Sequence, residues 1–241
     1  MNGANISMVN PAVERLSALL VPPTDPAGRP SDWGQVAESW NTGFPGDYRD
    51  FLTVCGAGAI DDYMVVATVL GSGPDLREST ISGLTDVARS LHQEHTDRRQ
   101  SVWPQAGGLV CWGATVDCGV LHWDTTDPDS DRWPVVVRDR GGDFTRFDFG
   151  MAEFVLRILG PSGQCPLESP RLHGAPNSRF LNRADEKRIE ASGGDPWEYL
   201  EELFEANEAD AADAEDGLLI IHHPDSSAEA IPGGTPPSRC D

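Results

Sequence analysis

The stretch GGLVCWGATVDCGVLHWDTTDPDSDRWPVVV, residues 107–137, decides the fold class. It contains three short runs rich in β-branched and aromatic residues, at 109–112, 120–123 and 133–137. Such runs predict β-strands, and the clusters of Gly, Asp and Pro between them predict turns. Because connections this short can only join antiparallel neighbours, the stretch predicts an antiparallel meander.

Further elements extend the meander in both directions. Toward the C-terminus, residues 144–147 read as a fourth strand, and an apolar stripe formed by Met151, Phe154, Val155 and Ile158 predicts a closing helix. Toward the N-terminus, the β-branched run at 63–70 predicts a strand. The polar stretch between them, 74–99, carries Leu84, Val87, Ala88 and Leu91 at helical spacing and predicts a helix.

Three short helices are predicted ahead of the sheet. The first begins at Asn10 and Pro11, an N-cap followed by a first-turn proline. The second begins at Ser31 or Asp32, and the third follows Pro45 and ends at Gly56, a residue typical of helix C-termini. Helices, a strand meander and a closing helix together predict an α+β fold, in one domain over residues 10–160.

The chain is strongly acidic. Its 241 residues hold 39 Asp and Glu against 18 Lys and Arg, a formal net charge of −21. Nucleic acid and anionic membrane surfaces are poor partners for such a chain, because both attract clustered Lys and Arg. We therefore expect neither as a direct partner.

Residues 161–241 differ from the rest in composition. Leu, Ile, Val and Phe supply 39 of the first 160 residues but only 13 of the last 81, and these 81 carry 17 acidic against 6 basic residues. That apolar content, about 16%, lies below the roughly 20% that a charged chain needs to fold. The composition predicts an acidic, mostly disordered extension over 161–241.

One helix is nevertheless expected in this extension, near residues 195–212. Asp195-Pro196-Trp197-Glu198 combines an N-cap, a first-turn proline and a capping-box glutamate. Trp197, Leu200 and Phe204 then line one side. Since an isolated helix of this length is marginally stable, we expect it to dock, either on its own domain or in a groove of a partner.

The cysteines and the N-terminus indicate a cytoplasmic protein. Five cysteines with no CxxC pair argue against a disulfide framework. Residues 1–20 lack the basic and apolar regions of a signal peptide, and no apolar run is long enough to cross a bilayer.

Metal sites are not supported by the spacing of possible ligands. Asp127, Asp129 and Asp131 match the opening of a calcium loop, but Arg132 and Arg138 stand where its Gly and Glu are required. A zinc site is equally unsupported, because its possible ligands match no compact pattern. These ligands are His92, His95, Cys111 and Cys118.

Catalytic motifs are also missing. No nucleophile elbow, Cys/His signature or pair of catalytic carboxylates is present, and Gly71-Ser72-Gly73 lacks the Lys of a phosphate loop. We expect no cofactor and no enzymatic activity.

Two blocks of sequence resemble the SUKH superfamily, the Smi/Knr-type domains. The first is a tryptophan helix, Trp33 to Trp40, followed by the segment GFPGDYRDFL at 43–52 and the glycine-rich CGAG at 55–58. The second is the meander quoted above, which looks like that of actinobacterial members. The resemblance covers about residues 30–160. The segment at 40–44 and the acidic extension depart from the family pattern.

The resemblance implies an α+β domain without catalytic residues, most bacterial members being immunity proteins that neutralise toxins. It also implies that the motif positions are structural, which agrees with their place on apolar stripes. The expected core residues are Trp33, Trp40, Pro45, Tyr48, Phe51, Leu52, Trp112, Trp123, Trp133 and Phe154.

Charge and resemblance together predict an immunity protein that binds a basic, nuclease-type toxin. Complementary charge speeds association, and a nuclease presents a basic surface to its substrate. The expected partner-binding residues are Asp61, Asp62, Asp124, Asp127, Asp129 and Asp131, with Trp197, Leu200 and Phe204 in the extension.

The alternative is a regulatory or scaffolding module like the fungal branch of the superfamily, recruiting a partner through the helix near Trp197. The sequence leaves the oligomeric state open.

Overall fold

Three helices lead into the domain of this computed structural model, as the capping signals predict. They are α1 (Pro11–Leu20), α2 (Trp33–Trp40) and α3 (Gly46–Val54). Asp32 caps α2 by accepting hydrogen bonds from the amides of Gly34 and Gln35, at 2.7 and 3.3 Å. Gly56, at φ 79°, follows α3 in the left-handed conformation that favours glycine.

The structure describes residues 9–20, 28–61, 63–70, 80–94, 100–159, 167, 180–196 and 198.

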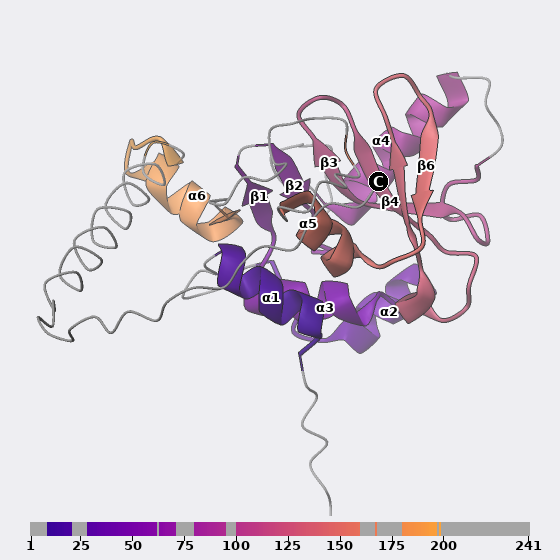
Figure 1. Ribbon diagram of the computed structural model, residues 1–241, viewed down its shortest axis with the longest axis horizontal. Coiled ribbons are helices and arrows are strands. Elements are labelled where there is room, and N and C mark those ends of the chain that lie inside the picture. Colours follow the sequence, from indigo (N-terminus) through magenta and orange to yellow (C-terminus); the bar gives the residue numbers. More distant parts are fainter. Residues whose placement is uncertain are drawn as a thin grey trace, which may run out of the picture. The chain divides into compact units, whose positions relative to one another are not determined.

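A seven-stranded antiparallel sheet forms the centre of the described residues (Figure 1). Its strands run in the order β6-β5-β4-β3-β2-β1-β7. Their bounds are β1 (Gly58–Ile60), β2 (Met64–Val66), β3 (Leu109–Thr115), β4 (Val120–Asp124), β5 (Val135–Arg138), β6 (Phe144–Phe147) and β7 (Phe180–Asn182). The remaining elements are α4 (Ile81–Glu94), the short 3₁₀ helix η2 (Ser130–Arg132), α5 (Met151–Leu159) and α6 (Arg183–Ala191). The α+β class, with a meander packed on N-terminal helices and a closing helix, is confirmed.

Helices cover both faces of the sheet. Neighbouring strand residues point to opposite faces, so Trp123 and His122 of β4 separate the two sides. Trp123 packs edge-on against Tyr48 of α3, with ring centroids 5.0 Å apart, on the side that also holds α5. On the other side, Phe144 of β6 lies between His122 and His92 of α4. The two layers bury the central strands β3, β4 and β5, whereas the edge strand β6 stays partly exposed.

The residues expected in the core are buried, with one exception. Tyr48, Phe51, Leu52, Trp112, Trp123 and Phe154 are fully buried, Trp40 and Trp133 nearly so, and Pro45 is also buried. Trp33 is only partly buried and packs against the core from its margin, contacting Phe44 and Tyr48.

Part of the region after residue 160, which composition predicts to be a disordered extension, is folded onto the domain. Phe180–Asn182 forms β7, which pairs antiparallel with β1, and Arg183 donates its amide to the carbonyl of Ala57 at 3.0 Å. The segment 180–191 is therefore part of the sheet and its flanking helix, and the boundary at 160 is too early. The average apolar content of residues 161–241 does not reveal this strand, because β7 consists of only three residues, Phe180, Leu181 and Asn182.

The chain divides into a unit covering residues 1–200 and a second unit, 201–241, which lies outside the described residues. Disorder there stays a prediction. At the start of the expected tail helix, Glu198 donates its amide to Asp195 Oδ1 at 3.4 Å, as the capping signal indicates.

Two local predictions are refined. The single strand expected at 63–70 is replaced by the hairpin β1–β2, whose second strand covers only Met64–Val66. The helix expected within 74–99 is α4, and 71–79 and 95–99 lie outside the described residues. None of the helices in the described ranges is long and apolar enough to span a bilayer.

Candidate functional site: one end of the sheet

The acidic loop, which we define as residues 124–132 between β4 and β5, is built from its own aspartates. Asp124, Asp127 and Asp129 each accept a hydrogen bond from the amide two residues ahead, at 2.9 to 3.1 Å. This is the Asx-turn geometry, in which a short carboxylate replaces a backbone acceptor. The alternate aspartates therefore shape the loop, and their spacing is explained without a cation.

The end of this loop is tied to the N-terminus of α3. Asp131 Oδ1 accepts the amide of Gly46, the first residue of α3, at 2.6 Å. Asp47, one residue on, accepts the amides of Tyr48 at 2.7 Å and Ala152 at 2.9 Å, which joins α3 to α5. Burial raises the pKa of Asp47 above its ordinary value, despite these two amides, which lower it. The loop is thus held on a rigid support.

The loop carboxylates differ in how much charge they present. Asp124 forms an ion pair with Arg146 of β6, and its side chain is only 14% exposed. Asp129 pairs with Arg132 at 3.4 Å but stays half exposed. Asp131 is exposed and Asp127 is partly exposed. Negative charge at this end of the sheet therefore comes from Asp127, Asp129 and Asp131 more than from Asp124.

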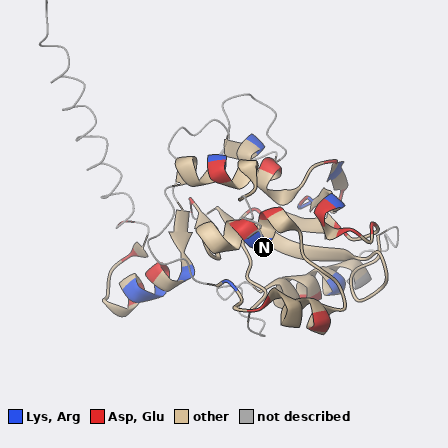
Figure 2. Cartoon of the chain, turned by 90° about the horizontal axis from the view of Figure 1, so that it is seen from below, with Lys and Arg blue, Asp and Glu red and all other residues tan. Residues whose placement is uncertain are grey.

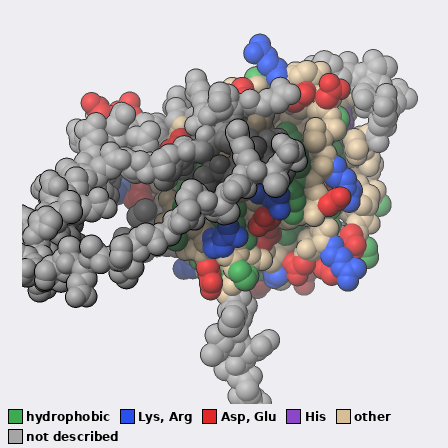
Figure 3. Space-filling model, viewed as in Figure 1, with side chains coloured by type: hydrophobic (Ala, Val, Ile, Leu, Met, Phe, Trp, Pro, Cys, Tyr) green, Lys and Arg blue, Asp and Glu red, His purple; other side chains and the backbone are tan. Residues whose placement is uncertain are grey.

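The predicted partner-binding residues do not form one patch. Asp61 lies in the turn between β1 and β2, at φ 50°, and the strand pairing places this turn at the opposite end of the sheet from the acidic loop. Asp62, Trp197, Leu200 and Phe204 lie outside the described residues. Figure 2 shows acidic and basic residues, and Figure 3 shows acidic and basic side chains, interspersed over the parts of the molecule that are not drawn in grey. A uniform acidic face is not visible in either view.

A cleft of about 280 Å³ lies beside the acidic loop. Two tryptophans from distant segments, Trp40 at the end of α2 and Trp103 in the loop before β3, line it with ring centroids 4.5 Å apart. Its other lining residues are Asn41, Thr42, Pro104, Gln105, Ala106, Gly107 and Thr125. None of these residues carries a charge.

Sequence reasoning missed this cleft. Trp40 was assigned to the core by its helical stripe, and its ring is indeed almost buried. Trp103 lies on no apolar stripe, and a tryptophan followed by proline outside any periodic run was the one signal that could have marked it.

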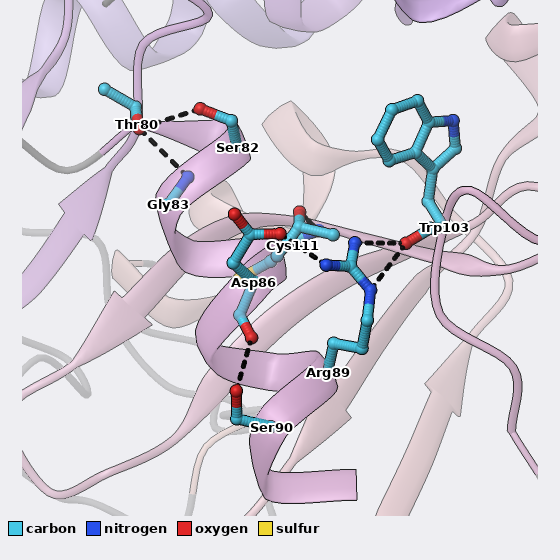
Figure 4. A network of polar contacts seen from close by, with 9 residues as sticks. Thr80, Ser82, Gly83, Asp86, Arg89, Ser90, Trp103 and Cys111 are labelled. Carbon is cyan, nitrogen blue, oxygen red and sulfur yellow. Dashed lines mark hydrogen bonds and ion pairs between the residues drawn. The ribbon is translucent and has the colours of Figure 1, made fainter. Parts of the chain in front are cut away.

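The loop that carries Trp103 is anchored to α4. The guanidinium of Arg89 donates from Nε and Nη2 to the carbonyl oxygen of Trp103, at 3.2 and 2.5 Å, and pairs with Asp86 one turn earlier (Figure 4). In the same network Thr85 accepts the amide of Cys111, which fastens α4 to β3. Trp103 is therefore held in position from behind, while its ring lines the cleft.

Among the described residues, the thiols of Cys55 and Cys111 and the imidazole of His122 lie inside the protein, whereas Cys118 is exposed. Burial raises the pKa of the Cys55 and Cys111 thiols to about 12 and lowers that of His122 to about 3. All three side chains are inaccessible. Within the described ranges, no three His, Cys, Asp or Glu residues come together in a group that could hold a metal ion. Cys55, Cys111 and His122 therefore offer no accessible nucleophile or base.

No family model matches the chain, no curated protein resembles it significantly in sequence, and no solved structure matches it significantly.

Proposed function

We propose that this chain is a non-catalytic, SUKH-type immunity protein that binds and neutralises a basic, nuclease-type toxin in the bacterial cytoplasm. The observation that carries the proposal is the acidic loop, whose carboxylates project from a support fixed by α3, β4 and β5. A preorganised surface loses little conformational entropy on binding, and exposed charge speeds association with an oppositely charged partner.

Two further features support this function. The motif residues that resemble the superfamily, such as Tyr48, Phe51 and Trp112, are core residues, as expected if the motif specifies a fold. The described cysteines Cys55, Cys111 and Cys118 are all free thiols, the first two buried and the third exposed, which suits a reducing compartment.

The test is rescue of cells from toxins encoded beside the gene. Each candidate toxin is expressed with and without this protein, and the pair is then tested for complex formation at low salt. We expect one toxin to be neutralised and bound. If no neighbouring toxin is neutralised and no complex forms at low salt, the proposal is wrong.

Charge-only variants sharpen this test. Asp127→Asn and Asp129→Asn keep a side-chain oxygen for the Asx turns while removing the charge. We expect the double variant to associate with the toxin several-fold more slowly, with a weaker dependence on salt. Asp143→Asn is the matched control, because Asp143 is also exposed but lies at the opposite end of the sheet. If the double variant and Asp143→Asn change the association rate equally, the acidic loop is not part of the interface.

A further inference from the structure

The cleft lined by Trp40 and Trp103, whose rings pack against each other, has the chemistry of a side-chain receptor. Its volume, about 280 Å³, lies just below the roughly 300–1,000 Å³ found for small-molecule sites. It thus fits one long side chain better than a cofactor. The walls combine two aromatic rings with the amides of Asn41 and Gln105 and the hydroxyls of Thr42 and Thr125.

The charges around the cleft favour a cation. Thr125 belongs both to the cleft and to the acidic loop, and Thr126 packs on Gly107 of the opposite rim. Glu38 lies in the last turn of α2, next to Asn41, and is exposed. The arginines that contact these segments are engaged: Arg132 of the acidic loop pairs with Asp129, Arg89 pairs with Asp86, and Arg146 pairs with Asp124 and Asp148. Among the described residues neither Glu38 of α2 nor Asp127 of the acidic loop forms an ion pair, so the charge left on the segments that carry the lining residues is negative.

The aromatic walls are fixed before any ligand arrives. Arg89 holds the carbonyl of Trp103, and the Trp103 amide donates to Leu109 at 3.1 Å. Trp40 packs edge-on against Phe44, at 5.5 Å, and so is supported by the core. Rigid aromatic residues of this kind are frequent at the energetic centres of protein interfaces.

We propose that this cleft receives an arginine side chain of the basic protein partner. An arginine guanidinium is planar, stacks on tryptophan faces and donates to several oxygen acceptors at once, whereas a lysine ammonium does so less well. The amide oxygens of Asn41 and Gln105 and the hydroxyl oxygens of the threonines supply those acceptors. This inference rests on the proposed function, since it names the side chain by which the toxin is anchored.

The experiment uses the full chain labelled with 5-fluorotryptophan and observed by ¹⁹F NMR. The probes are hexa-arginine, hexa-lysine and hexa-glutamate peptides at low salt. The Trp40 and Trp103 resonances are assigned from Trp40→Phe and Trp103→Phe. We expect hexa-arginine to shift these two resonances selectively and to bind more tightly than hexa-lysine, with no binding of hexa-glutamate.

Variants then measure the contribution of the cleft. Trp103→Ala is expected to weaken hexa-arginine binding about tenfold, and Trp103→Phe much less, because phenylalanine keeps a π face. Gln105→Ala, on the exposed rim, serves if Trp103→Ala does not fold, and is expected to weaken binding several-fold. Equal binding of hexa-arginine and hexa-lysine, shifts at other tryptophans only, or unchanged affinity in these variants would overturn the proposal.

The two proposals fail in different ways. If the toxin is neutralised and bound equally well by wild type and Trp103→Ala, the arginine site is wrong while the immunity function stands. If hexa-arginine binds in the cleft but no toxin is neutralised, the immunity function is wrong.

Discussion

At the scale of single residues, the aspartates of the acidic loop serve the fold as well as the surface charge. Their spacing resembles part of a calcium loop, yet each carboxylate is used by a nearby amide. Sequence identified these residues because Asp is common in turns. It could not tell which carboxylates would remain exposed, because the pairing of Asp124 with Arg146 depends on strands 22 residues apart in sequence.

Because Asp129 both accepts the Asp131 amide and carries a charge, its substitution by Asn and by Ala should have different effects on stability. Asp129→Asn keeps the acceptor for the Asp131 amide, so we expect the free energy of unfolding to change by less than about 0.5 kcal/mol. Asp129→Ala removes the acceptor and is expected to cost about 1 kcal/mol. Urea denaturation measures both. Equal destabilisation by Asn and Ala would show that the Asx turn contributes nothing.

His122 predicts a pH dependence of stability. It is fully buried between β4 and α4, its Nδ1 lies 3.3 Å from the carbonyl of Val136, and its Nε2 has no hydrogen-bond partner among the described residues. Burial lowers its pKa from 6.5 to about 3, with smaller contributions in the same direction from His92 and Arg138. Since the unfolded chain takes up a proton that the folded protein excludes, stability present above pH 6.5 is lost as the pH falls toward 3.

Between pH 7.5 and pH 5, this effect amounts to about 2 kcal/mol. His122→Leu, of similar volume and without a titrating group, should lose that much less stability over the same interval. The measurement is the urea midpoint at both pH values in wild type and variant. If both proteins lose stability equally, His122 is not the titrating group.

At the scale of elements, the structure confirms helices and strands that local sequence signals predict. The pairing of strands far apart in the sequence could not be predicted from such signals. The starts of α2 and α3, the end of α3 at Gly56 and strand β6 follow from caps, turns and periodicity within a few residues. The β1–β7 pairing joins residues about 120 positions apart, and a three-residue strand has no periodicity to detect. The cleft was missed for the same reason, because it requires Trp40 and Trp103 to meet.

Strand β7 packs so closely on β1 that there is no room for a side chain at Gly58. A Cβ at this position would lie 2.2 Å from the carbonyl oxygen of Leu181 and 2.8 Å from the ring of Phe180. Gly58→Ala must therefore displace β7, and we expect a loss of about 1–3 kcal/mol in the free energy of unfolding. Hydrogen exchange should show faster exchange of the amides in β7.

Gly141→Ala is the matched control for this change. A Cβ there would meet only the side chain of Asp139, at 3.3 Å, in an exposed turn. We expect less than about 0.5 kcal/mol of destabilisation. If Gly58→Ala behaves like this control, β7 does not pack on β1 as described.

At the scale of the whole molecule, the domain is larger than its motif. The residues on which the proposed SUKH assignment rests end near residue 160, whereas strand β7 of the sheet covers Phe180–Asn182. Of the net charge of −21, the residues after 160 supply about half, and the helix described among them, α6, carries both signs. The charge is therefore a property of two regions, of which only the first is described in detail.

Two truncations predict opposite results. A chain ending at residue 200 retains all seven strands of the described sheet, and we expect its Tm to match that of the full chain within a few degrees. A chain ending at residue 160 lacks β7 and leaves β1 as an uncovered edge, which favours aggregation. Thermal denaturation and light scattering compare the two. Equal stability of both truncated chains would show that β7 is dispensable.

The position of β7 in the chain also affects biosynthesis. Its partner β1 leaves the ribosome about 120 residues earlier, which corresponds to roughly 6 to 24 s at ordinary rates of synthesis. During that interval the backbone amides and carbonyls along one side of β1 lack their partner strand, although β2 is already present on the other side. Each nascent chain on a polysome therefore exposes a strand edge that a neighbouring nascent chain could pair with, until its own residues 180–182 emerge and close it.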